Sequence, residues 1–300
     1  MQNQSSDFKT GYVRLISLLR RKNRTLGIFS KLQGCFYPNF RMLPRRGYFE
    51  AAMERVARRG PVVSIDEYQN ELVGDRLLRE GFRKATEARL IRGEFDEYVG
   101  MRRIGNLVTY YGLIRELKPS LVVETGTFSG ESASMILAAL NRNSHGKLIS
   151  INLPAVAGEL TMDATVKPSE VGCMIPERYR DRWEYVCGDA KEFLPAILAN
   201  NRVDIFIHDS LHTRTHMLYE LNVARALLPD GGVIISDDVL WNKAFVCFLE
   251  SHNLQGIACE SNPNLAITVN SFDEYEKRIG LGIVRLQNGG ISRVERAAGS

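Results

Sequence analysis

Acids and histidines follow two apolar segments in the second half of the chain. Residues 203–212 read Val-Asp-Ile-Phe-Ile-His-Asp-Ser-Leu-His, and residues 231–238 read Gly-Gly-Val-Ile-Ile-Ser-Asp-Asp. We expect His212 to be a general base, with His208 as the second choice, because an imidazole with a pKa of about 6.5 can take a hydroxyl proton at neutral pH. A single histidine is more often structural than catalytic. The chain has only five histidines, however, and His216 is a third in this short stretch.

Three carboxylates belong to the same two segments: Asp209, Asp237 and Asp238. If both segments are parallel strands, their carboxyl ends meet at one edge of the sheet and the carboxylates converge there. Close carboxylates repel one another and need protons, basic neighbours or a cation. Oxygen ligands without cysteine favour a hard ion such as Mg²⁺. The alternative is a structural role, in which Asp209 and Asp238 cap the following helices or Asp209 pairs with His212.

Residues 121–130, Leu-Val-Val-Glu-Thr-Gly-Thr-Phe-Ser-Gly, join an apolar run to an acid and a glycine turn. The run suits a strand buried on both faces, while Gly126 and Gly130 allow a tight turn and a close approach to a ligand. No lysine lies between positions 125 and 141, which argues against a phosphate loop. A dinucleotide loop would need glycine where Glu124 stands. The stretch therefore predicts a ligand without phosphate, with a ligand-free turn as the alternative.

Strands that alternate with helices must position these groups. The apolar patterns predict strands at 121–124, 148–152, 183–187, 203–207, 232–236, 255–260 and 282–286. They predict helices at 48–59, 67–80, 98–117, 131–140, 190–198, 215–228 and 242–251. Such alternation indicates an α/β, Rossmann-like, doubly wound fold with a mostly parallel sheet of seven strands. The long connection between 153 and 181 is typical of a lid or binding loop.

The glycine loop resembles motif I of the class I S-adenosylmethionine-dependent methyltransferases, Glu/Asp-x-Gly-x-x-x-Gly. The resemblance covers about residues 98–287 and implies an antiparallel last strand. At the end of the second strand the family usually has an acid that holds the ribose, where this chain has the neutral amide of Asn152. The Gly-Asp-Ala turn at 188–190 resembles the family's turn beside the adenine. The resemblance implies that S-adenosyl-L-methionine is bound by Glu124, Gly126, Thr127, Ser129, Gly130, Asn152, Asp189 and Ala190.

The two later strand ends resemble the metal-dependent O-methyltransferases of the catechol, caffeoyl-coenzyme A and macrolide-sugar types. In these families an Asp after the fourth strand and an Asp-Asp or Asp-Asn pair after the fifth hold the metal. The resemblance implies Mg²⁺ on Asp209, Asp237 and Asp238, although counting from the strand core puts His208 at the first of these positions.

We therefore expect methylation of a hydroxyl on a small molecule or glycan. The alternatives are an N-methyltransferase without metal and a noncatalytic adenosyl-binding or scaffold protein. The Asn/Asp-Pro-Pro-Tyr motif of base-flipping methyltransferases is absent, so no nucleic-acid substrate is expected.

The domains expected from these patterns are a basic helical N-terminal extension at 1–97, a methyltransferase domain at 98–290 and a tail at 291–300. No apolar run approaches the roughly 18 residues of a membrane span, and no signal-peptide pattern is present. Five cysteines without a Cys-x-x-Cys pair indicate reduced thiols, so a cytoplasmic location is expected.

Residues 1–60 hold thirteen Lys and Arg against three Asp and Glu, so the N-terminal arm is strongly basic. Three interpretations stay open. A helix in the arm covers the core or a homodimer interface, the arm docks on an anionic membrane or substrate, or it is a mitochondrial transit peptide.

Overall fold

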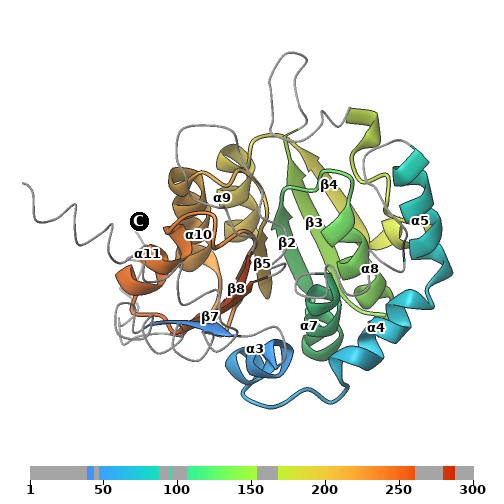
Figure 1. The fold of residues 1–300 in the computed structure, drawn as a ribbon. Coiled ribbons are helices and arrows are strands. Elements are labelled where there is room, and N and C mark those ends of the chain that lie inside the picture. The colour runs from blue at the N-terminus through green and yellow to red at the C-terminus, as the bar shows by residue number, and fades with distance from the viewer. Residues whose placement is uncertain are drawn as a thin grey trace, which may run out of the picture.

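The computed structural model describes residues 39–43, 47–87, 95, 107–153, 168–260 and 280–287. Within these residues the chain forms one sheet of eight strands in the order β1-β7-β8-β6-β5-β2-β3-β4 (Figure 1). The strands are β1 (Phe40–Leu43), β2 (Leu121–Thr125), β3 (Lys147–Asn152), β4 (Trp183–Cys187), β5 (Ile205–His208), β6 (Val233–Ser236), β7 (Gly256–Glu260) and β8 (Gly280–Arg285).

The sheet has the predicted topology. Neighbouring strands are parallel throughout, except that β8 runs antiparallel to both β6 and β7. The doubly wound α/β fold with an antiparallel last strand is thus confirmed. One strand is additional: β1 comes from the segment for which only helices were predicted, and it pairs in parallel with β7 at the edge of the sheet.

Helices cover both faces of the sheet (Figure 1). They are α3 (Tyr48–Ala57), α4 (Ile65–Val73), α5 (Arg76–Glu87), α7 (Thr109–Leu117), α8 (Glu131–Asn143), α9 (Ala190–Asn200), α10 (Arg214–Leu227) and α11 (Ala244–Ser251). Side chains alternate along each strand, so Val122 belongs to the core on the side of α3, α7 and α8, whereas Val123 belongs to the core on the side of α9, α10 and α11. Each such fully buried aliphatic side chain contributes roughly 1.5–3 kcal/mol to folding.

The N-terminal helices are part of this core. Tyr48 of α3 is buried and its hydroxyl donates a hydrogen bond of 2.8 Å to the Leu281 carbonyl in β8. The single helix predicted at 67–80 is two helices. Ser64 begins α4 with a capping box, and the Asp75 carboxylate accepts backbone N–H groups at the start of α5, so the chain changes direction between them. The boundary at residue 97 stays a prediction.

Several predictions fall outside the described residues. These are the basic arm before residue 39, with its membrane, dimer and transit-peptide interpretations, most of the predicted lid, and the tail. Among the described residues, no helix is long and apolar enough to cross a membrane.

Candidate functional site

The glycine loop leaves β2 at the edge of the sheet where the parallel strands end. Gly126 has φ +85°, and its N–H donates to the Ile151 carbonyl of β3 at 2.9 Å. A Cβ at this position would lie 1.9 Å from the backbone oxygen of Asp209, which follows β5. Gly130, with φ +90°, makes the second turn and leads into α8. The loop therefore needs glycine for both its conformation and its contact with β5.

Asn152 fixes the backbone of the same loop. Its Oδ1 accepts the N–H of Thr127 at 3.0 Å and that of Phe128 at 3.3 Å. The hydroxyl of Thr127 is buried and has no hydrogen-bond partner among the described residues. A buried hydroxyl without a partner is costly, which suits a loop that meets a polar ligand. Ser129 is also buried, and its carbonyl accepts the N–H of Met174 at 2.9 Å.

Glu124 is fully buried beneath the loop and makes internal contacts. Its two oxygens accept hydrogen bonds from Ser150 in β3 at 2.6 Å and from Ser132 in α8 at 3.1 Å. Trp183 in turn donates to the Ser150 hydroxyl at 2.8 Å. Burial raises the pKa of Glu124 to about 7, although both serine hydrogen bonds lower it. These contacts join β3, α8 and β4 around the buried carboxyl group. A contact between Glu124 and the cofactor stays a prediction.

Asp189 and Ala190 lie where β4 leads into α9. The Asp189 side chain caps α9 by accepting the Lys191 N–H at 2.8 Å, and Ala190 is the first residue of that helix. Asp189 is therefore a helix cap, and its place beside an adenine stays a prediction.

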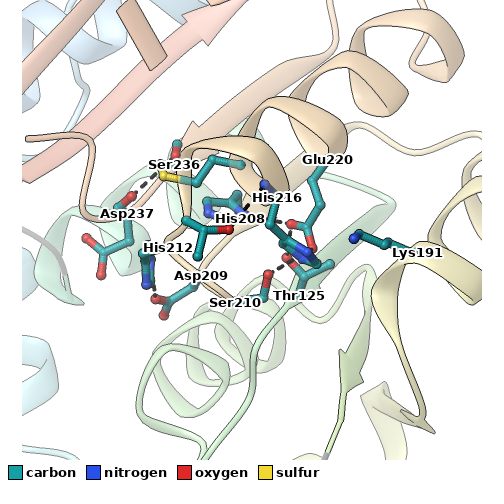
Figure 2. A network of polar contacts seen from close by, with 12 residues as sticks. Thr125, Lys191, His208, Asp209, Ser210, His212, His216, Glu220, Ser236 and Asp237 are labelled. Carbon is teal, nitrogen blue, oxygen red and sulfur yellow. Dashed lines mark hydrogen bonds and ion pairs between the residues drawn. The ribbon is translucent and has the colours of Figure 1, made fainter. Parts of the chain in front are cut away.

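His212 lies among the carboxylates that follow β5 and β6 (Figure 2). Its Nε2 is 3.8 Å from Oδ1 of Asp209, and its Nδ1 is 3.8 Å from Oδ2 of Asp238. Its ring stacks on Trp241 with centroids 5.5 Å apart and meets the ring of His208 edge to face at 5.3 Å. Burial, the largest cause, and the neighbouring His208 together lower the pKa of His212 to about 3, although Glu220 opposes the shift. The imidazole is therefore neutral at physiological pH.

Among the carboxylates, Asp238 is buried, whereas Asp209 and Asp237 are partly exposed. Burial and then Asp237 raise the pKa of Asp238 to about 8, and burial followed by Asp237 and Asp238 raises that of Asp209. Within the described ranges, no three His, Cys, Asp or Glu side chains are arranged to hold a metal ion. The predicted ligands are thus neighbours, but as placed they do not form a ready ion site, and we derive no step through a metal.

Glu220 of α10 is a central residue of the site that the sequence analysis missed. Its buried carboxylate accepts hydrogen bonds from four side chains, as Figure 2 shows: Thr125, Ser210, His208 and His216. Burial alone would raise its pKa, but the hydrogen bonds from the two histidines outweigh that effect and lower it. Glu220 is consequently ionised. The available signal was its spacing of four residues from His216, which places both on one face of a helix.

Tyr110 of α7 was also missed. It is 1% exposed, and its hydroxyl has no hydrogen-bond partner among the described residues. Its pKa is raised well above the usual value by burial first and then by Asp237 and Asp209, so the phenol lies within electrostatic range of the carboxylates. Tyr110 of α7, the helix before β2, is therefore a further candidate residue of the site.

A surface cavity of about 370 Å³ lies elsewhere. Its lining includes Ser120, Asp204 and Val233, which stand at the amino ends of β2, β5 and β6. The candidate site occupies the carboxyl ends of the same strands, so this cavity does not belong to it.

The central part of the chain matches a known family of protein domains. Residues 123–239 match the family model described as a methyltransferase domain; the match starts in β2 and ends just after Asp238. No curated protein matches the chain. The family match covers the glycine loop and the acidic ends of β5 and β6, and it agrees with the resemblance to methyltransferases seen in the sequence.

Among the similar solved structures are three methyltransferases. An O-methyltransferase from Bacillus cereus in complex with SAH has a TM-score of 0.46 at 16% identity, covering 74% of this chain and 96% of its own. TomG from Streptomyces achromogenes, in complex with SAM, has a TM-score of 0.46 at 15% identity, with coverages of 75% and 100%. PaMTH1 from Podospora anserina, bound to SAH, has a TM-score of 0.45 at 14% identity, with coverages of 76% and 100%. At these TM-scores the structures do not bear on the substrate of the present chain.

Proposed function

We propose that this enzyme methylates a hydroxyl group of a small molecule or glycan, with S-adenosyl-L-methionine as the donor. The observation that carries the proposal is the contact between the glycine loop and the end of β5. Gly126 packs directly on the Asp209 backbone, three residues before His212. A cofactor held by the loop would therefore have imidazole and carboxyl groups beside it.

The residues of the loop fit such a cofactor. The unpartnered Thr127 hydroxyl offers it a hydrogen bond, and the Asn152 amide, whose oxygen is already used by the loop, retains its NH₂ group for a ribose oxygen. A neutral amide binds a hydroxyl without the extra strength of a charged acceptor. Once bound, the cofactor supplies an activated methyl group on a sulfonium.

The remaining chemistry is orientation and removal of a proton. Holding the acceptor oxygen in line with the methyl group contributes up to roughly 7–11 kcal/mol in well-oriented systems. His212 is neutral and its Nε2 is buried without a hydrogen-bond partner among the described residues, so its lone pair is open to the proton of an incoming hydroxyl. Because its pKa is lowered to about 3, it is a weak base unless the charge that forms on it is stabilised. Asp209 and Asp238 flank the ring, and a positive charge that develops on it is stabilised between them.

The first test is calorimetric titration of the full-length protein with S-adenosylhomocysteine, repeated with EDTA and with added Mg²⁺. Saturable binding with a Kd in the micromolar range supports the proposed donor. Thr127→Val, which removes the unpartnered hydroxyl at nearly constant shape, should weaken this binding by about fivefold or more. Absence of binding in every condition would contradict the proposal.

A screen of acceptors then addresses the reaction. Turnover on catechols or sugar hydroxyls supports O-methylation, and dependence on Mg²⁺ would show that the carboxylates rearrange around an ion. Turnover on amines alone would favour an N-methyltransferase. Binding without turnover on any acceptor would favour a scaffold protein.

A further inference from the structure

The segment of residues 168–182, which we call the strap, is hydrogen-bonded to the glycine loop. Within the strap, the Gly172 N–H donates to the Phe128 carbonyl at 2.9 Å, and the Met174 N–H donates to the Ser129 carbonyl, also at 2.9 Å. Such backbone hydrogen bonds hold a loop in one conformation, because a carbonyl that leaves its donor must find another. The strap therefore fixes two successive residues of the loop that is proposed to bind the methyl donor.

Helix α5 packs on the strap through Gly81, which is buried. A Cβ at this position would lie 2.0 Å from the carbonyl oxygen of Met174 and 2.9 Å from its carbonyl carbon. A helical conformation does not itself need glycine, and alanine is more favourable inside a helix, so the close approach is what requires glycine here. Met174 thus contacts the helix through its carbonyl group and the glycine loop through its N–H.

A buried hydrogen bond is a second connection between α5 and the strap. Tyr179 is 3% exposed, and its hydroxyl donates to Oδ2 of Asp75 at 2.8 Å. Oδ1 of the same carboxylate accepts the N–H groups of Leu77 and Leu78 at the start of α5, at 2.9 Å and 3.1 Å. One carboxylate therefore holds both the first turn of the helix and the strap.

This helix lies outside the part of the chain that matches the methyltransferase family. α5 ends at Glu87, whereas the family match begins at residue 123. A loop that is held in its binding conformation before the ligand arrives binds more tightly, because less order has to be imposed on binding. The contacts of α5 with the strap should therefore contribute to the affinity for the donor.

We propose that Gly81 and Tyr179 are positioning residues for the methyl donor, which hold the strap where it fixes the glycine loop. This inference rests on the proposed function, because it takes the loop to be the donor site. It adds to that function a role for the N-terminal helices, in which α5 acts through the strap and does not touch the donor.

The first variant is Gly81→Ala in the full-length protein. The new Cβ collides with the Met174 carbonyl, so the helix or the strap must shift. We expect the Kd for S-adenosylhomocysteine, measured by calorimetry, to rise by about tenfold or more. Gly74→Ala is the control, because a Cβ on Gly74 would meet only backbone oxygens of α4, at 3.4 Å and 3.7 Å. Its Kd should stay within about threefold of wild type. An equally small change in Gly81→Ala would overturn the proposal.

Tyr179→Phe is the milder variant and decides the matter if Gly81→Ala fails to fold. It removes only the hydroxyl that donates to Asp75, and the Kd should rise by about fivefold or more. Tyr68→Phe is the matched control. Tyr68 is also 3% exposed, and its hydroxyl donates to the Glu116 carboxylate at 3.0 Å, away from the strap. The same rise of Kd in both variants would mean that the effect reflects general destabilisation, which would overturn the proposal.

Hydrogen exchange of the unliganded protein, followed by mass spectrometry, tests the contact without the donor. In Tyr179→Phe we expect exchange to become about fivefold faster or more in peptides from the glycine loop and the strap, and to stay unchanged in α11. Unchanged exchange in the loop, or equal acceleration in α11, would overturn the proposal even if the donor binds. Because this measurement needs no ligand, it separates a failure of this inference from a failure of the proposed donor binding.

Discussion

Gly126 and Asp209 lie in direct backbone contact: a Cβ on Gly126 would stand 1.9 Å from the Asp209 carbonyl oxygen. The Asp209 N–H also donates to the carbonyl of Thr125 at 3.0 Å, just before the glycine. The loop that would hold the methyl donor is thus fixed to the segment that bears the histidines. A shift of either segment changes the distance between donor and base, which is a quantity to which transfer rates are sensitive.

Gly126→Ala should therefore destabilise the fold. The new Cβ collides with backbone, which cannot move aside as a flexible side chain would, and φ +85° is unfavourable for alanine. We expect the free energy of unfolding to fall by at least about 2 kcal/mol, measured by urea denaturation. Gly60→Ala is the control, because a Cβ on Gly60 would have no atom within 4 Å and the residue has no positive φ. Its effect should stay within about 1 kcal/mol. Equal stability of the two variants would contradict the close packing of Gly126 on Asp209.

Glu124→Gln should change how stability depends on pH. The pKa of Glu124 is raised in the folded state from 4.5 to about 7. The stability that the fold has with a protonated Glu124 is therefore fully present below pH 4.5 and is lost as the pH rises through 7. The shift corresponds to a penalty on the order of 3 kcal/mol at pH 8. Glutamine has no charge to bury. Relative to wild type, the variant should thus gain unfolding free energy between pH 5 and 8 in denaturation curves.

The exposed Glu184 of β4 provides the control for this pH dependence. Glu184→Gln should follow the wild-type curve within about 0.5 kcal/mol at each pH. The prediction fails if Glu124→Gln runs parallel to wild type over the same range.

The regular elements were predictable because their signals are local. The strand Trp183–Cys187 was predicted with its observed bounds, and the glycine turn after β2 follows from residue types alone. The strand β1 was not predicted, because four residues in an arginine-rich segment carry no clear alternation and pair only when β7 is in place.

The site was predictable only in part, because some of its contacts form only when segments distant in the sequence pack together. The chain places His208, Asp209 and His212 together by sequence, and the parallel sheet brings Asp237 and Asp238 beside them. Glu220 could not be assigned, since its contacts with Thr125 and His208 depend on how α10 packs on the sheet. The cofactor-contact roles, the metal and the identity of the base remain predictions.

His212→Asn should lower catalysis without affecting the cofactor. Asparagine cannot take a proton, so kcat on the acceptor found in the screen should fall by roughly 10²- to 10⁴-fold. The Kd for S-adenosylhomocysteine should stay within about threefold of wild type, as measured by calorimetry. His252→Asn, which alters a histidine outside the site on the carboxyl end of α11, should leave both values unchanged. Retention of kcat in His212→Asn would exclude His212 as the base.

Tyr110→Phe should separate stability from function. The Tyr110 hydroxyl is buried without a partner among the described residues, so its removal should leave the unfolding free energy unchanged or raise it by about 1 kcal/mol. Tyr48→Phe is the matched control, because the equally buried Tyr48 hydroxyl donates to the Leu281 carbonyl. That variant should lose about 1–2 kcal/mol of unfolding free energy.

If the Tyr110 hydroxyl meets a bound ligand beside Asp209 and Asp237, Tyr110→Phe should also lower kcat/KM by about fivefold or more despite its intact fold. A kcat/KM equal to that of wild type would mean that the unmet hydroxyl serves neither binding nor catalysis, and that the site ends at the strand termini.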